Sequence, residues 1–140
     1  ERIVKNMKKL RGLLVVLVMT GLLCGCQMLD TKEVKLRDLD FVILSEEVLP
    51  KELKEIVEER KAEPFKLTYS DADALYICIG YGEQKTGGYS ITVDELYLTD
   101  SAIYVETTLL GPGDKGSNKA PSYPYIVIKT EALDETVVCE

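Results

Sequence analysis

Short segments in which apolar and polar residues alternate constrain the fold of this chain more than any other feature. Residues 65–69 alternate strictly, and within residues 74–79 the apolar Leu75, Ile77 and Ile79 share one parity. Because successive side chains of a strand point to opposite faces of a sheet, this period of two predicts strands. Residues 125–129 are apolar on both parities, which predicts a strand that is central or covered on both faces.

Three further strands are expected around these segments. Residues 39–44 form a short apolar run that suits a first strand. Residues 89–98 and 103–109 flank a short polar turn at 99–101, which predicts a hairpin. The parity of the apolar residues changes at Asp94-Glu95, and this change predicts a bulge or a bend.

The spacing of four apolar residues predicts a helix ahead of these strands. They are Leu49, Leu53, Ile56 and Val57. Residues at i, i+4, i+7 and i+8 share one helix face, while Pro50 suits the first turn and Pro64 ends the helix. The expected fold class is therefore α+β: a mainly antiparallel β-sheet or small β-sandwich with one N-terminal amphipathic helix.

Residues 1–25 resemble a secretory leader. Lys8, Lys9 and Arg11 precede an apolar run at residues 13–23, which is shorter than the roughly 20 residues that a membrane span requires. We interpret the residues ahead of Met7 as upstream translation.

The leader ends in Leu23-Cys24-Gly25-Cys26, which resembles a bacterial lipobox with Cys26 as the lipidated residue. Cys24 fits less well because bulky Leu23 precedes it; an ordinary leader that contains two cysteines is the remaining alternative. Two or more acyl chains on Cys26 would hold the protein at the outer face of the cytoplasmic membrane. We therefore predict a leader at residues 1–25, a lipidated tether at 26–37 and one β-rich domain at 38–140.

Charge and composition restrict the function. The chain has 17 basic and 24 acidic residues, of which residues 1–25 hold five and one, leaving a net charge of about −11 after cleavage. This acidity argues against nucleic acid or anionic lipid as a partner and favours a basic protein surface. The chain contains no histidine, which excludes Ser-His and Cys-His nucleophile pairs and histidine metal sites.

Two further pairs of residues, one acidic and one of cysteines, are explained by structural roles more readily than by a reaction. Asp71 and Asp73 precede a predicted strand and suit turn formation better than catalysis or metal binding. Cys78 and Cys139 could pair in an oxidising exterior, although the apolar surroundings of Cys78 equally suit a small buried side chain. We expect no enzymatic activity, no metal and no cofactor.

Two long loops rich in glycine and proline interrupt the strands. The first contains Thr86-Gly87-Gly88-Tyr89, and the second contains Gly111-Pro112-Gly113 and ends in Pro124-Tyr125. These strings, in this order and among these strands, resemble the PrcB C-terminal domain family over about residues 74–130. The resemblance implies a non-catalytic accessory subunit that stabilises a cell-surface protease complex.

We predict that these loops contact a partner, a surface protein such as a protease. The candidate residues are Lys85, Thr86, Gly87, Gly88, Tyr89, Gly111, Gly113, Tyr123, Pro124 and Tyr125. The alternative is that both loops only supply the turns of the fold.

The same loops are also similar to those of chagasin-type inhibitors of cysteine proteases. Two departures count against that function. The first loop has an extra glycine and lacks a leading Asn-Pro, and Tyr123-Pro124-Tyr125 stands where that family has Arg-Pro-Trp.

Overall fold

The computed structural model describes residues 33–113 and 118–140 of the chain. The chain divides into two units, residues 1–33 and 34–140, and the fold is that of the second. The predicted leader, Cys26 and most of the predicted tether lie outside the described residues. Within the described ranges, no helix combines the length and the apolar character needed to cross a membrane.

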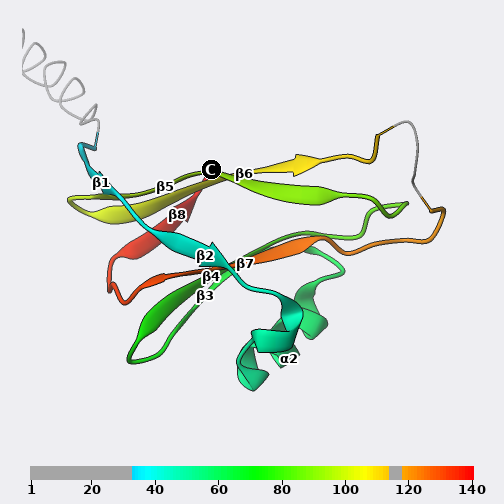
Figure 1. Cartoon of the computed structure of the whole chain (residues 1–140), viewed down its shortest axis with the longest axis horizontal. Helices are drawn as coiled ribbons and strands as arrows, with labels where there is room; N and C mark the ends of the chain where they lie inside the picture. Colours follow the sequence, from blue (N-terminus) through cyan, green and yellow to red (C-terminus); the bar gives the residue numbers. More distant parts are fainter. Residues whose placement is uncertain (1–32, 114–117) are drawn as a thin grey trace, which may run out of the picture. The chain divides into compact units, whose positions relative to one another are not determined.

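The described residues form two four-stranded sheets (Figure 1). Sheet A contains, in spatial order, β1 (Lys35–Asp38), β5 (Ser90–Thr99), β6 (Ala102–Leu110) and β8 (Thr136–Cys139). Sheet B contains, in spatial order, β2 (Phe41–Ile43), β7 (Tyr125–Glu131), β4 (Ala74–Tyr81) and β3 (Pro64–Ser70). Neighbouring strands are antiparallel except β6 and β8, which are parallel. The predicted mainly antiparallel architecture is confirmed, and the two sheets fit a sandwich.

The two sheets pack face to face through an apolar core. β4 contributes Leu75, Ile77 and Ile79, whose shared parity predicted one buried face, and β6 contributes Ile103 and Val105. Removing one such side chain from water stabilises the fold by about 1.5–3 kcal/mol, so this core is the main source of cohesion between the sheets.

The other face of sheet B is covered by α2 (Lys51–Arg60), which follows the 3-10 helix η2 (Glu46–Val48) (Figure 1). α2 lies where the apolar spacing predicts a helix, and it buries Leu53 and Val57. Phe65, Cys78 and Val127 of sheet B belong to the same buried cluster. β4 and β7 are thus covered on both faces, which explains why β7 is apolar on both parities.

The β5–β6 hairpin has the predicted turn and bulge. The register shifts between Val93 and Glu95, where the parity of the apolar residues changes. The hydroxyl of Thr99 closes the turn, since it accepts a hydrogen bond from the Ala102 amide at 3.0 Å and donates one to the Ala102 carbonyl at 3.1 Å.

The structure differs from the strands expected from sequence in three places. β1 begins at Lys35, within the segment predicted as the tether at residues 26–37. The predicted first strand is shortened to β2, because buried Leu39 lies where the chain crosses from sheet A to sheet B. The short strand β8 was not predicted, because its position depends on parallel pairing with the distant β6.

Cys78 and Cys139 are both unpaired. Cys78 faces α2 from sheet B, whereas Cys139 packs against the core between the sheets. The two thiols therefore lie on opposite sides of sheet B. Burial raises the pKa of Cys78 to about 12, so this residue is a protonated, buried side chain of the core.

Candidate functional site

The first glycine-rich loop, residues 82–89, connects β4 to β5 at one end of the domain (Figure 1). Gly82 and Gly88 have φ values of 77° and 85°, a conformation that strongly favours glycine. Gly87 lies outside that region. A Cβ at Gly87 would lie 2.8 Å from the side chain of Asn118, so any larger residue here would require the Asn118 side chain to shift.

The two loops are joined by hydrogen bonds. The amide of Gln84 donates to the carbonyl of Ser122 at 2.8 Å, and the amide of Ser122 donates back to Gln84 at 3.0 Å. The Ser122 hydroxyl donates to the carbonyl of Thr86 at 2.6 Å, and the Gly87 amide donates to Asn118 at 3.2 Å. Residues 82–89, 111–113 and 118–124 are called the loop surface below.

The predicted contact residues at the centre of this surface differ in exposure. Lys85 is exposed, whereas Thr86 is half-buried and its carbonyl accepts a hydrogen bond from the Ser122 hydroxyl. Tyr89 is half-buried, and a Cβ at Gly111 would lie 3.8 Å from its ring, which places the Gly-Pro-Gly segment beside it. A Cβ at Gly113 would meet nothing within 4 Å, so this residue lies in open space.

The aromatic residues at the end of the second loop separate into two groups. Tyr123 is 37% exposed, and the ammonium group of Lys61 lies 5.5 Å from the centre of its ring. Tyr125 instead packs against the cluster beneath α2, and burial together with the nearby Glu46 carboxylate raises its pKa. Pro124 is joined to β4 through its carbonyl, which accepts a hydrogen bond from the Tyr81 amide at 3.0 Å. Tyr123 is thus the better placed aromatic group for a partner.

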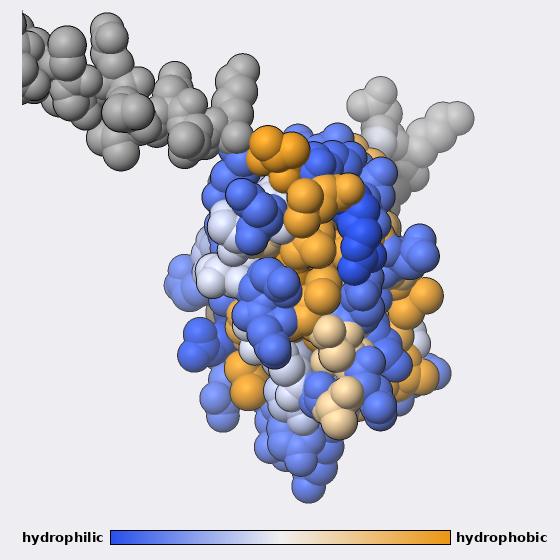
Figure 2. Space-filling model, turned by 90° about the vertical axis from the view of Figure 1, so that its left-hand side faces the viewer, coloured by the Kyte–Doolittle hydropathy of each residue, from blue (hydrophilic) through white to orange (hydrophobic). Residues whose placement is uncertain are grey.

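The opposite end of the domain carries a strip of apolar surface, which Figure 2 shows in orange. β1 runs to this end, because Lys35 pairs with Thr99 at the last residue of β5. Val34 and Leu36 there are 67% and 59% exposed. The ten residues of β5 separate this end from the loop surface by roughly 30 Å at the usual rise of a strand.

The carboxylate groups singled out from the sequence form a turn in the structure. No group of three or more carboxylate or thiol side chains in residues 33–113 and 118–140 is placed to hold a metal ion. Asp71 forms a turn, as predicted, since it accepts hydrogen bonds from the amides of Asp73 and Ala74, each at 2.9 Å. These bonds, with that from Asp73 the strongest, lower the pKa of Asp71.

Sequence reasoning missed the residues that join the two loops. Gln84, Asn118 and Ser122 are ordinary polar residues in the sequence, and their role depends on contacts between segments more than thirty positions apart. The available signal was weak, because Asn and Ser in a loop rich in proline usually indicate only local turns.

The family model described as PrcB C-terminal matches residues 75–131. This segment runs from β4 into β7 and contains the whole loop surface, and it confirms the resemblance inferred from the loop motifs. No curated protein and no solved structure matches the chain.

Proposed function

Because residues 75–131 match the PrcB C-terminal family, we propose that the chain is a non-catalytic accessory subunit that binds and stabilises another cell-surface protein, such as a protease. The observation that carries this proposal is that the matched segment ends in one surface built from two loops that bind each other. A surface stabilised by its own hydrogen bonds loses little conformational entropy when a partner binds.

The membrane anchor belongs to the same proposal. Lipidation of Cys26 would place the protein at the outer face of the cytoplasmic membrane, with a tether that joins the domain at Val34. Val34 lies at the end of the domain opposite the loop surface, so the tether would not join the domain at the proposed contact residues.

The side chains that best fit a contact role are Lys85 and Tyr123. Both are exposed, and Tyr123 is stiffened by the adjacent ammonium group of Lys61. Aromatic and basic groups of this kind dominate the binding energy of many interfaces.

Cross-linking and pull-down of the full chain from native membranes tests this function. The parent should recover a partner, a Lys85→Ala, Tyr123→Ala double variant should recover much less of it, and Lys35→Ala at the opposite end should behave like the parent. Equal recovery by all three variants, or repeated recovery of the chain alone, would contradict the proposal.

The anchor is tested separately with the Cys26→Ala variant. We expect this variant to lose incorporation of labelled fatty acid and to leave the membrane fraction. An unchanged membrane fraction would remove the anchor from the proposal without affecting the partner experiment.

A chagasin-like inhibitor remains the second candidate, because residues 82–89, 111–113 and 122–124 gather at one end of the domain. Titration of a papain-like protease with the full chain distinguishes the two functions. Full protease activity at excess chain would eliminate inhibition, whereas stoichiometric loss of activity would favour it over the accessory role.

A further inference from the structure

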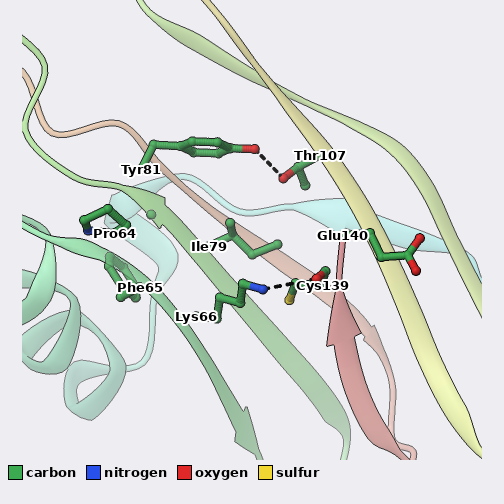
Figure 3. A pocket seen from close by; sticks show the side chains of 9 residues that line it. Pro64, Phe65, Lys66, Ile79, Tyr81, Thr107, Cys139 and Glu140 are labelled. Carbon is green, nitrogen blue, oxygen red and sulfur yellow. Dashed lines mark hydrogen bonds between the residues drawn. The ribbon is translucent and has the colours of Figure 1, made fainter.

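One side of the domain leaves the two sheets open between their last strands. β8 is the last strand of sheet A, and β3 is the last strand of sheet B. Two pockets of about 460 and 400 Å³ lie between them, the larger one bordered by Phe65, Lys66 and Cys139 (Figure 3). The space between these two strands is called the β3–β8 cleft below.

The β3 side of the cleft lacks a facing strand. Alternate residues of β3, including Phe65, pack toward α2, whereas Lys66, Thr68 and Ser70 line the two pockets. The ammonium group of Lys66 crosses the cleft and donates a hydrogen bond to the carbonyl of Cys139 at 3.1 Å (Figure 3). A further strand beside β8 would lie opposite this face of β3.

The residues of β8 themselves lack the features that usually protect a sheet edge, although an added strand would have to displace the Lys66 ammonium group from the Cys139 carbonyl. Charged residues, proline and bulges discourage such pairing. β1 has lysine, arginine and a bulge, and β3 has Pro64 and Lys66. β8 consists of Thr-Val-Val-Cys and pairs regularly with β6.

The smaller pocket contains a carboxylate oxygen that needs a donor. Oε2 of Glu135 is buried and has no hydrogen-bond partner in the described structure, and Glu135 lines the pocket beside Asp134. The guanidinium group of Arg37 binds Glu131 at 2.6 Å, and this bond is the main reason that the pKa of Arg37 is raised; the charge of Glu135 adds only a smaller contribution. A buried, unpaired carboxylate oxygen is costly, so a cationic donor in this pocket would be favourable.

We propose that the β3–β8 cleft binds an extended, basic segment of a partner protein, which adds to β8 as a fifth strand of sheet A. Its lysine or arginine binds Glu135, and an apolar side chain fills the larger pocket. Along β3, the larger pocket is bordered by residues 64–66 and the smaller one by residues 68 and 70, so their centres are about four residues apart. A strand that lies opposite β3 would therefore fill them with two side chains four positions apart. Strand addition of this kind draws affinity from backbone bonds and specificity from alternate side chains.

The probe is a labelled nine-residue threonine peptide with valine and arginine at positions 3 and 7, made in both orders. Fluorescence anisotropy with the full chain should give a Kd below about 1 mM for one order. Replacing the peptide arginine by glutamate, or Glu135→Gln in the protein, should weaken binding by roughly tenfold to a hundredfold, as expected for a hydrogen bond to a charged group. Glu47→Gln, an exposed change on η2, is the matched control.

Amide chemical shifts locate the bound peptide. We expect the largest changes at Thr136–Cys139, with little change at the edge strand β2. Absence of binding in both orders, binding unaffected by Glu135→Gln, or shifts at β2 would each overturn the proposal. A concentration-dependent dimer that competes with the peptide would assign the cleft to a second copy of the chain and would also overturn it.

This inference rests on the proposed function only in assuming a protein partner, and it adds a second surface to that partner's contact. Because the peptide experiment needs neither membranes nor the native partner, its failure leaves the pull-down result intact. Failure of the pull-down likewise leaves the peptide result standing.

Discussion

The loop surface and the β3–β8 cleft satisfy their polar groups in different ways. In the loop surface, Gln84, Thr86 and Ser122 bind one another across two loops. In the cleft, Glu135 has a buried oxygen without a hydrogen-bond partner among the described residues, and β3 and β8 are there the last strands of their sheets. The described residues of the loop surface are therefore held by bonds within the fold, whereas the cleft is the region for which we propose an added strand.

The largest expected effect concerns Gly80, where the two regions meet. A Cβ there would lie 2.2 Å from the ring of buried Phe65, so the ring would have to shift. Gly80→Ala should lower the free energy of unfolding by about 1–3 kcal/mol, the usual cost of overpacking. Urea denaturation measures this, and a variant as stable as the parent would show that β3 and β4 are more loosely packed than described.

The next effect tests whether the loop surface has a fixed shape. Gly88→Ala places a side chain at a φ of 85° and should cost about 1–2 kcal/mol in unfolding free energy. Gly113→Ala adds a Cβ that meets nothing within 4 Å and should leave stability nearly unchanged. Thermal denaturation of the pair checks the difference, and equal melting temperatures would mean that the first loop tolerates other conformations.

A direct contrast between the two regions comes from single polar substitutions. Ser122→Ala removes the hydrogen bond to Thr86 and should cost about 1 kcal/mol. Glu135→Gln removes a charge whose oxygen has no partner, so the free chain should lose no stability. Chemical denaturation of both variants measures the contrast, and a clear loss for Glu135→Gln would show that the cleft is already satisfied without a partner.

The smallest effect is a dependence on pH outside both regions. Hydrogen bonds, first that from the Asp73 amide, lower the pKa of Asp71 below its ordinary value of 3.8. A lowered folded pKa stabilises the fold above that value, and this contribution is lost as the pH falls further. Asp71→Asn should therefore flatten the loss of stability below pH 3.8, as followed by denaturation at stepped pH. An unchanged dependence of stability on pH would mean that the hydrogen bonds of the turn do not favour the charged form of Asp71 over its protonated form.

Much of the domain follows from local patterns in the chain. The alternation in β3, the shared parity in β4 and the phase change in β5 each arise because one face of a strand is buried. The covering of β7 on both faces was also readable, because its apolar residues occupy both parities. β8 escaped prediction because four residues that pair with a distant strand leave no periodic signal.

The residues of the candidate site were likewise predictable only in part. Its glycines and tyrosines were found from composition and from the resemblance of the loops to the PrcB C-terminal family. The residues that join the loops, Gln84, Asn118 and Ser122, were not found, because most of their bonds join distant backbone groups, which do not depend on residue type, and the bond of the Ser122 hydroxyl depends on which segment lies beside it. The cleft was missed entirely, since an unfilled edge is a property of strand order.

The sequence by itself determined the strand class, the turns, the absence of histidine chemistry and the positions of the two glycine-rich loops, because side-chain period and backbone freedom are local properties. Only the tertiary structure decided that the loops bind each other, that Cys78 and Cys139 lie on opposite sides of sheet B, and that β8 is the last strand of sheet A among the described residues. Those outcomes depend on which segments lie side by side, and that arrangement is set by burial of the shared core.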